Sequence, residues 1–160
     1  GEHAAFPGTL SIGTEALFQV LLELGRDAST HWRAILFVNA HGGNTEAVTR
    51  AVVALRDEGR RCDVFHAASP GADAHAGRTE TSLLLHLAPE LVRTEAMAAG
   101  DPRPIAELLP ALRRGGVRAV SANGVLGDPA GASAEEGVEV LSRLTRGCAS
   151  RLDELAGDDG

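Results

Sequence analysis

One histidine stands where a predicted strand gives way to a loop rich in glycine. The apolar run at residues 34–38 leads into the loop residues Asn39, Ala40, His41, Gly42, Gly43 and Asn44. Ligands of parallel α/β proteins bind at the carboxyl ends of the strands, and glycine lets the backbone approach a ligand closely. His41 is therefore a candidate metal ligand or acid–base group. The alternative is a tight turn that carries an incidental histidine.

A second loop follows the strand predicted at residues 62–65. It carries Asp73 and His75, and Glu80 lies in the first turn of the helix predicted after it. Both loops leave the carboxyl ends of parallel strands, so we expect His41, His75 and Glu80 to converge, with Asp73 as a further candidate. The alternative role of Glu80 is a favourable charge at the positive end of its helix.

The Glu2–His3 corner precedes a predicted bend at Pro7-Gly8, and it is a further candidate for the same site. Its alternative is a solvated charged end. Histidine and carboxylate groups form the ligand set of zinc, iron and manganese, and a metal that they bind can activate water and polarise a carbonyl group. A catalytic zinc usually takes three protein ligands, so these residues alone are too few for a secure site.

Other catalytic classes lack their residues. The chain has no G-x-S-x-G motif for a serine nucleophile. It has no lysine, and therefore no phosphate-binding G-x-x-x-x-G-K motif. The two cysteines, Cys62 and Cys148, are isolated and form no C-x-x-C pair, which favours a reducing compartment and a cytoplasmic protein.

The elements that position these loops follow from apolar spacing. A helix is predicted from an N-cap at Thr14 to a stop at Gly25, with Leu17, Val20, Leu21 and Leu24 at helical spacing. The run at 34–38 shows no alternation, so it is expected to be a strand buried on both faces. A helix with an apolar stripe over residues 47–55 and the strand at 62–65 complete a βαβ unit.

The second half of the chain is less regular. After the helix that contains Glu80, residues 90–92 are predicted to be extended, residues 105–113 helical and residues 117–120 a short strand. Ser133 and Glu136 form a predicted capping box. The box opens a last helix whose inward residues are expected to be Val138, Leu141, Leu144 and Leu152, and an acidic tail is expected to fray over residues 156–160.

Length and overall composition favour one globular domain and argue against some classes of protein. The 160 residues suit one domain, and 44% hydrophobic residues can form a core. A formal net charge of -7 argues against nucleic-acid binding, and no apolar run approaches a membrane span. The chain begins without methionine, directly before a structured segment, so we expect a fragment that lacks an N-terminal portion.

Three groups of residues resemble motifs of the creatininase (creatinine amidohydrolase) family and occur in the family's order. They are Gly1-Glu2-His3 with Phe6-Pro7-Gly8-Thr9, the stretch 39–44, and His75-Ala76-Gly77 with Glu80-Thr81-Ser82. Residues 125–129 and the helix after them fit the family's C-terminal part. The resemblance implies a three-layer α/β/α sandwich with a mostly parallel sheet and a two-metal site at the carboxyl ends of the strands.

The resemblance also assigns roles to single residues. His41 matches a metal ligand, and His75 matches the proton-transfer residue, which Glu80 either orients or joins in the metal shell. Substrate binding or support of the ligands is expected from Glu2, His3, Asn39, Gly42, Gly43, Asn44 and Asp73. The family's other ligands, a Glu-x-His pair and an Asp, lie in an N-terminal motif, so residues 1–160 are expected to form one creatininase-like domain without its N-terminal strand and that motif.

Departures from the family pattern narrow the substrate. Creatininase proper carries a glutamate where this chain has Gly43, which argues against creatinine. Ala40 replaces a glycine, a change that we expect to be tolerated. Residues 70–87 and 104–117 are most similar to the branch that acts in mycofactocin biosynthesis, whose peptidase removes the modified C-terminal Val-Tyr unit of a precursor peptide.

The function implied by this resemblance is metal-dependent hydrolysis of a C–N bond in a modified ribosomal peptide. Fe²⁺, Zn²⁺ or Mn²⁺ is the implied cofactor, with two ions in the full-length protein, and a homo-oligomer is the implied assembly. The alternatives are another cyclic-amide or formamide hydrolase of the family, or a fragment that is catalytically incompetent.

Overall fold

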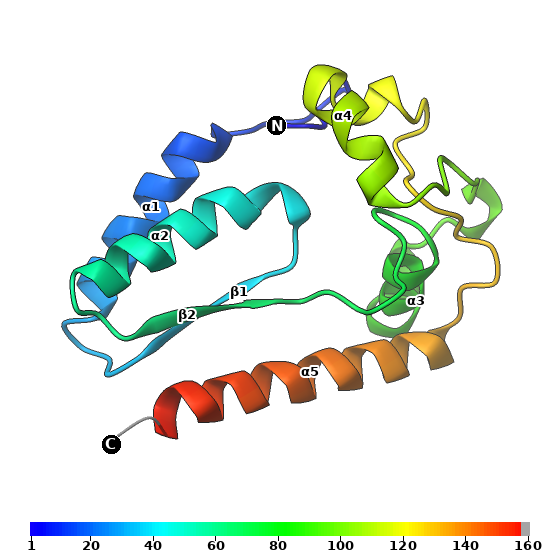
Figure 1. Ribbon diagram of the computed structural model, residues 1–160. Helices are drawn as coiled ribbons and strands as arrows, with labels where there is room; N and C mark the ends of the chain where they lie inside the picture. Colours follow the sequence, from blue (N-terminus) through cyan, green and yellow to red (C-terminus); the bar gives the residue numbers. More distant parts are fainter. Residues whose placement is uncertain (158–160) are drawn as a thin grey trace. The chain divides into compact units, whose positions relative to one another are not determined.

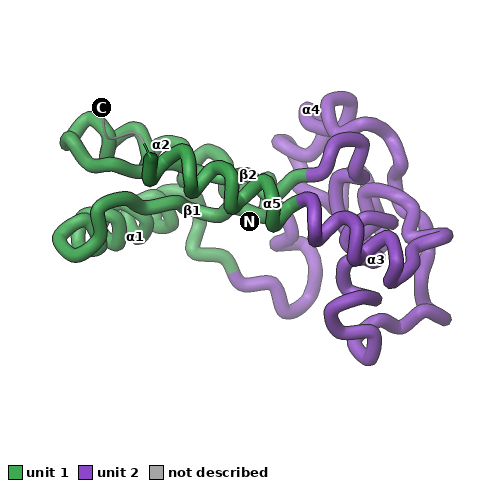
Figure 2. The backbone as a smooth tube through the Cα atoms, turned by 90° about the horizontal axis from the view of Figure 1, so that it is seen from below, with its two compact units in different colours: residues 1, 11–68, 144–160 green, residues 2–10, 69–143 purple. Residues whose placement is uncertain are grey.

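The computed structural model describes residues 1–157, which separate into two compact units (Figure 2). Unit 1 contains Gly1, Ser11–Ala68 and the C-terminal part of the chain from Leu144. Unit 2 contains Glu2–Leu10 and Ser69–Arg143. Among the described residues, no helix has both the length and the apolar character that crossing a membrane requires.

Unit 1 is built on the βαβ element that the sequence predicts. Strands β1 (Ile35–Asn39) and β2 (Cys62–His66) pair in parallel, and helix α2 (Thr45–Asp57) connects them. Helix α1 (Gly13–Ala28) packs beside α2, and the C-terminal part of α5 (Ala134–Gly157) lies on the other face of the strands (Figure 1). Parallel strands between helical layers confirm the predicted α/β fold class.

The core of unit 1 lies between α1, α2 and the strands. Its buried side chains are Leu22, Val52, Leu55 and Cys62. Burial raises the pKa of the Cys62 thiol, so this residue packs rather than reacts. Gly25 is also buried, and a Cβ at this position would collide with the Leu55 side chain. The predicted helix stop at Gly25 is therefore wrong: α1 continues past it, and the glycine allows α1 and α2 to approach closely.

Several predicted apolar faces differ from the structure. Val38 is 59% exposed, so the prediction of a strand buried on both faces is wrong there. In α1, Val20 and Leu24 are exposed and the buried face is offset from them. In α5, the predicted inward residues Val138 and Leu152 are exposed, whereas the buried ones are Val140 and Leu155. Residues 158–160 of the expected acidic tail lie outside the described residues.

Unit 2 contains α3 (Arg78–Leu87), α4 (Ile105–Gly115) and the N-terminal part of α5, joined by loops and short 3-10 turns. Its core packs Leu108, Val117 and Leu126 together, with Phe6 against them. These residues come from separate stretches of the sequence. The core therefore ties the N-terminal segment to the loop around Leu126.

Two predicted extended segments of unit 2 are 3-10 turns instead, at Pro89–Leu91 and Val117–Ala119. Pro89 begins the first turn, because its fixed φ suits a first helical position. The second turn follows Gly116, whose φ of 67° redirects the chain. The backbone N–H of Val117 donates to the Glu2 carbonyl oxygen, and its side chain is buried in the core. The strand prediction is wrong here because Val117 bonds the Glu2 carbonyl and packs in the core instead of pairing with a neighbouring strand.

The predicted capping box forms in part. The Glu136 N–H donates to the Ser133 hydroxyl oxygen at 3.2 Å, as expected. The second bond of the box is replaced by Ser82, which is fully buried: its hydroxyl accepts the Ser133 N–H at 3.1 Å and donates to the Glu136 carboxylate at 3.2 Å. This arrangement fixes the start of α5 against α3.

One buried carboxylate holds the layers of unit 1 together. Asp63 of β2 has a side chain only 10% exposed, and its carboxylate pairs with Arg56 of α2 at 2.8 Å and with Arg151 of α5. We expect Asp63→Asn to lower the free energy of unfolding by about 2 kcal/mol, since two half-exposed arginines lose their common partner. Urea denaturation measures this change. Asp57→Asn, at the exposed end of α2, is the matched control, and an equal loss in both variants would contradict the role of Asp63.

Candidate metal and acid–base site

The His41 loop of unit 1 is held by the last residue of β1. Asn39 is buried, and it lies opposite His66, the last residue of β2. Its side-chain oxygen accepts the His41 N–H at 3.3 Å, and its amide nitrogen lies 3.1 Å from Nδ1 of His66. Because an amide nitrogen only donates, Nδ1 of His66 is the acceptor. Asn39 therefore joins the ends of both strands and fixes the backbone from which His41 projects.

The His41 side chain is exposed, and one of its ring nitrogens is already engaged. Nδ1 accepts the backbone N–H of Gly43 at 3.1 Å, so in a neutral ring the proton lies on Nε2. A metal that binds Nδ1 replaces the Gly43 N–H. A metal that binds Nε2 moves the proton to Nδ1, and the Gly43 amide then loses its acceptor. In both cases the Gly43 N–H would need another acceptor.

Sequence reasoning passed over His66. The strand predicted at residues 62–65 stops one residue before it, whereas the observed β2 ends at His66 as β1 ends at Asn39. The available signal was its place directly after an apolar strand, the same feature that marked His41. His66 now joins the polar groups at the carboxyl ends of the two strands.

In unit 2, His75 is held by its backbone and by a carboxylate. It pairs with Leu126 in an antiparallel bridge, with N···O distances of 2.8 and 3.1 Å. Glu80 lies at the start of α3, and its carboxylate is 3.5 Å from Nδ1 of His75. The same carboxylate accepts the Ala76 N–H at 2.5 Å. Glu80 thus closes the turn and lies beside one ring nitrogen of His75.

Ala76 marks the turn as unusual. Its φ is 53°, the left-handed region that residues with a Cβ seldom adopt. Such a conformation costs on the order of 1 kcal/mol, and here the Glu80 carboxylate and the Leu126 bridge hold it in place on both sides. The strained turn thus holds the backbone of His75 beside Glu80.

The Glu2–His3 corner belongs to the same group. The ring of His3 lies 4.7 Å from that of His75, tilted by 51°. The Glu2 carboxylate is 3.7 Å from Nε2 of His3. The Val117 N–H donates to the Glu2 carbonyl oxygen at 2.9 Å, which anchors the corner. Unit 2 thus gathers two imidazoles and two carboxylates from residues 2–3 and 75–80.

Asp73 has a structural partner. Its two carboxylate oxygens accept the backbone N–H groups of Arg78 and Thr79, the first residues of α3. A Cβ at Gly77 or at Gly127 would collide with the Asp73 side chain. Asp73 therefore caps α3 in a close-packed space, and it positions the loop rather than contributing a free carboxylate.

The donor groups fit a divalent transition metal. Imidazole and carboxylate are its ordinary ligands, and a Cβ at Gly42 would meet no atom within 4 Å, so the space beside the His41 turn is open. His41 alone cannot hold a catalytic ion, which usually takes three protein ligands.

Comparison with known proteins gives the class. The family model described as Creatininase: Creatinine amidohydrolase matches residues 1–152, and the chain belongs to this family. A solved structure of a mutant creatininase has the same fold, with a TM-score of 0.74 and 24% identity over 93% of this chain and 67% of that one. The match runs through both compact units.

Similarity to named relatives is closer. The chain is 53% identical over 161 residues to the mycofactocin precursor peptide peptidase of Mycobacterium ulcerans, covering 100% of this chain and 64% of that protein. It is 52% identical over 152 residues to the protein of that name from Mycolicibacterium smegmatis, covering 95% and 62%. The corresponding Mycobacterium tuberculosis protein is 53% identical, with 95% and 61% covered. The chain thus spans somewhat less than two thirds of these relatives' length.

Proposed function

We propose that the protein containing this chain is a metal-dependent peptidase that cleaves the mycofactocin precursor peptide and releases its modified C-terminal Val-Tyr unit. The observation that carries this proposal is the identity of 52–53%, over 95–100% of the chain, to proteins named for that activity. Family membership supports hydrolysis of a C–N bond. Gly43, in the place of creatininase's glutamate, supports a substrate other than creatinine.

His41 is the proposed metal ligand of this chain, and Asn39 fixes its backbone. We propose that residues 1–160 belong to one creatininase-like domain and that further ligands lie in the part of the relatives' length outside this chain. Fe²⁺, Zn²⁺ or Mn²⁺ suits imidazole and carboxylate donors, and we propose two ions. When bound, the metal supplies an activated water and polarises the scissile carbonyl group.

His75 is the proposed proton carrier. Amide hydrolysis requires a proton on the leaving nitrogen, and an imidazole can deliver it near neutral pH. The Glu80 carboxylate lies 3.5 Å from Nδ1, which leaves Nε2 for the transfer. The ring of His3 also lies against that of His75. Glu2, His3 and the loop residues Gly42, Gly43 and Asn44 are proposed to contact substrate or support the ligands.

The protein is further proposed to be cytoplasmic and homo-oligomeric. Two free cysteines support a reducing compartment. Exposed apolar side chains, such as Trp32 at 70% and Val20 at 55%, offer surface for further chain or a second copy to cover.

The test is direct hydrolysis by the protein at its native length, loaded in turn with each of the three metals. The modified precursor peptide, creatinine and a formamide are offered separately, and products are identified by mass spectrometry. We expect release of the C-terminal two-residue unit from the peptide alone and loss of this activity after chelation. If creatinine or the formamide is hydrolysed while the peptide stays intact, the protein is a cyclic-amide or formamide hydrolase of the family and not the peptidase.

A further inference from the structure

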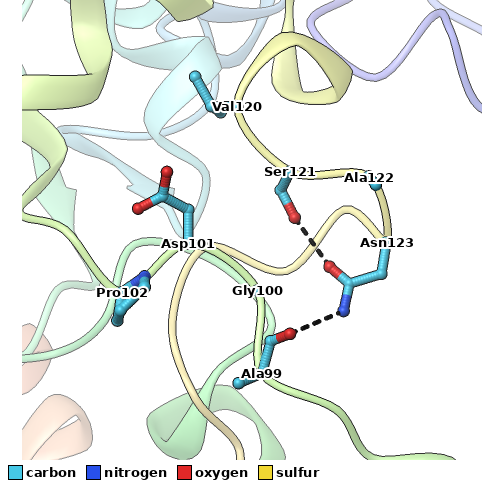
Figure 3. A pocket seen from close by; sticks show the side chains of 8 residues that line it. All are labelled: Ala99, Gly100, Asp101, Pro102, Val120, Ser121, Ala122 and Asn123. Carbon is cyan, nitrogen blue, oxygen red and sulfur yellow. Dashed lines mark hydrogen bonds between the residues drawn. The ribbon is translucent and has the colours of Figure 1, made fainter.

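A pocket of about 500 Å³ lies in unit 2, between residues 99–102 and 120–123 (Figure 3). Its size is that of ordinary small-ligand sites. The walls are short apolar side chains and backbone, from Ala99, Gly100, Pro102, Val120 and Ala122. Polar groups come from Asp101, Ser121 and Asn123. Apolar walls with a few polar groups suit a side chain that is apolar along its length.

The polar groups have different tasks. The Ser121 hydroxyl donates to the Asn123 side-chain oxygen at 2.8 Å, and the Asn123 amide donates to the Ala99 carbonyl at 3.1 Å. These bonds join the two walls and hold the pocket in shape, as Figure 3 shows. Asp101 takes no part in them. Its carboxylate points into the space between the walls (Figure 3).

The charge of Asp101 is balanced by Arg103. Arg103 donates to both carboxylate oxygens, at 2.6 Å to Oδ2 and 3.0 Å to Oδ1. This contact lowers the pKa of Asp101, so the carboxylate stays an acceptor at neutral pH. Because an arginine neutralises it, the pocket offers a hydrogen-bond acceptor without a net negative charge. A neutral ligand group with one donor fits better than a cation.

The pocket is tied to His75 through a shared segment, residues 125–127. On one side, Gly100 and Asp101 donate their backbone N–H groups to the carbonyls of Gly127 and Val125, at 3.0 and 3.1 Å. On the other side, Leu126 forms the bridge with His75. A Cβ at Gly100 would collide with the Val125 carbonyl, so this close contact requires glycine.

This arrangement sets the distance between the pocket and His75, the proposed proton carrier. Neighbouring hydrogen-bonded segments lie about 5 Å apart, so the pocket wall is on the order of 10 Å from the His75 backbone. An extended peptide advances about 3.3–3.6 Å per residue. If the scissile bond lies beside His75, a side chain two or three residues away from that bond can therefore reach the pocket.

We propose that this pocket binds the aromatic side chain of the residue two positions beyond the scissile bond, a tyrosine whose phenol donates to Asp101. The proposal rests on the proposed peptidase function and adds a specificity site to it. The phenol is neutral and planar, and it carries one donor at the end of an apolar ring. A site that hydrogen-bonds a hydroxyl prefers it over the analogue that lacks it. The preference expected here is modest, because Arg103 already donates to the Asp101 carboxylate.

Binding of two free dipeptides, Val-Tyr and Val-Phe, tests the pocket without turnover. With the metal-loaded protein at its native length, calorimetry is expected to show Val-Tyr binding about tenfold more tightly. Ala122→Leu, which fills the pocket from an exposed wall position, is expected to weaken Val-Tyr about tenfold. Ala106→Leu on the exposed face of α4 is the matched control and should leave both affinities unchanged.

Asp101→Ala is expected to remove the preference for Val-Tyr. Since it also frees Arg103, the Ala122 variant stands as the independent measurement. Equal affinities for the two dipeptides in the unaltered protein, no detectable binding, or unchanged binding in Ala122→Leu would overturn the proposal. Cleavage of the precursor peptide, assayed in parallel, reports the proposed function separately, because the pocket can fail while hydrolysis persists.

Discussion

Replacement of His75 by alanine is expected to lower turnover by about 10²–10⁴-fold, the usual contribution of a positioned acid–base group. The substrate KM and the metal content are expected to stay within a few-fold of the unaltered protein. The reason is geometric: only the side chain of His75 is proposed to carry the proton. Its backbone bridge to Leu126 and the Ala76–Glu80 contact do not depend on the imidazole. Steady-state kinetics and elemental analysis of the same preparation measure both quantities.

His86→Ala supplies the control for His75. His86 lies on the exposed face of α3, in the same unit, and no role in the chemistry is proposed for it. Turnover should be unchanged in this variant. A His75→Ala protein with turnover within about threefold of normal would remove His75 from the mechanism. A folded His75→Ala protein that has lost its metal would instead place the residue among the ligands.

The βαβ unit could be predicted because its signals are local. The unbroken apolar run at 34–38 and the stripe over 47–55 each fit one period, and the observed elements Ile35–Asn39 and Thr45–Asp57 agree closely with them. The two loops after the strands then followed from parallel topology. His41 and His75 were found as candidates because histidine is a reactive type at a place where ligands bind.

What failed depended on contacts between distant residues. The sequence around Val117 has β-branched residues, but its backbone N–H is taken by Glu2 and its side chain packs on Leu108. Glycine is a common residue at helix ends, but Gly25 lies inside α1. A glycine is needed there because a Cβ would collide with the Leu55 side chain of α2. Local propensity cannot anticipate a partner that lies elsewhere in the chain.

The same limit applies to the candidate site. That His3 packs on His75, and that Asp73 caps α3, follow from tertiary contacts that spacing does not encode. The Asp101 pocket was missed for a different reason. Its residues are small, carry no recognised motif, and come together only through the bonds of Gly100 and Asn123. Residue types in the sequence can indicate a catalytic group, whereas a specificity pocket depends on the shape that tertiary contacts produce.

The second large effect is expected from His41→Ala. This change removes an imidazole from the proposed metal ligands, so we expect metal affinity to fall by more than about 100-fold and hydrolysis to drop to background. Loss of partners that merely support a ligand already costs about 10–100-fold. The fold should persist, because the His41 side chain is exposed and the loop stays anchored by the Asn39 contact to the His41 backbone. Metal content after gel filtration and the far-ultraviolet circular dichroism spectrum measure these two expectations.

His31→Ala is the matched control, since His31 is an exposed histidine of the same unit outside the loop. It should retain both metal and activity. The contrast with His75→Ala is the sharper discrimination, because the two substitutions remove the same side chain from different roles. His41→Ala is expected to lose metal and turnover together, and excess metal should restore part of the turnover. His75→Ala should keep its metal and gain nothing from an excess. Full metal content and normal turnover in His41→Ala would refute its role as a ligand, and the strand-end histidine would then be only the cap of a short turn, bonded to Gly43.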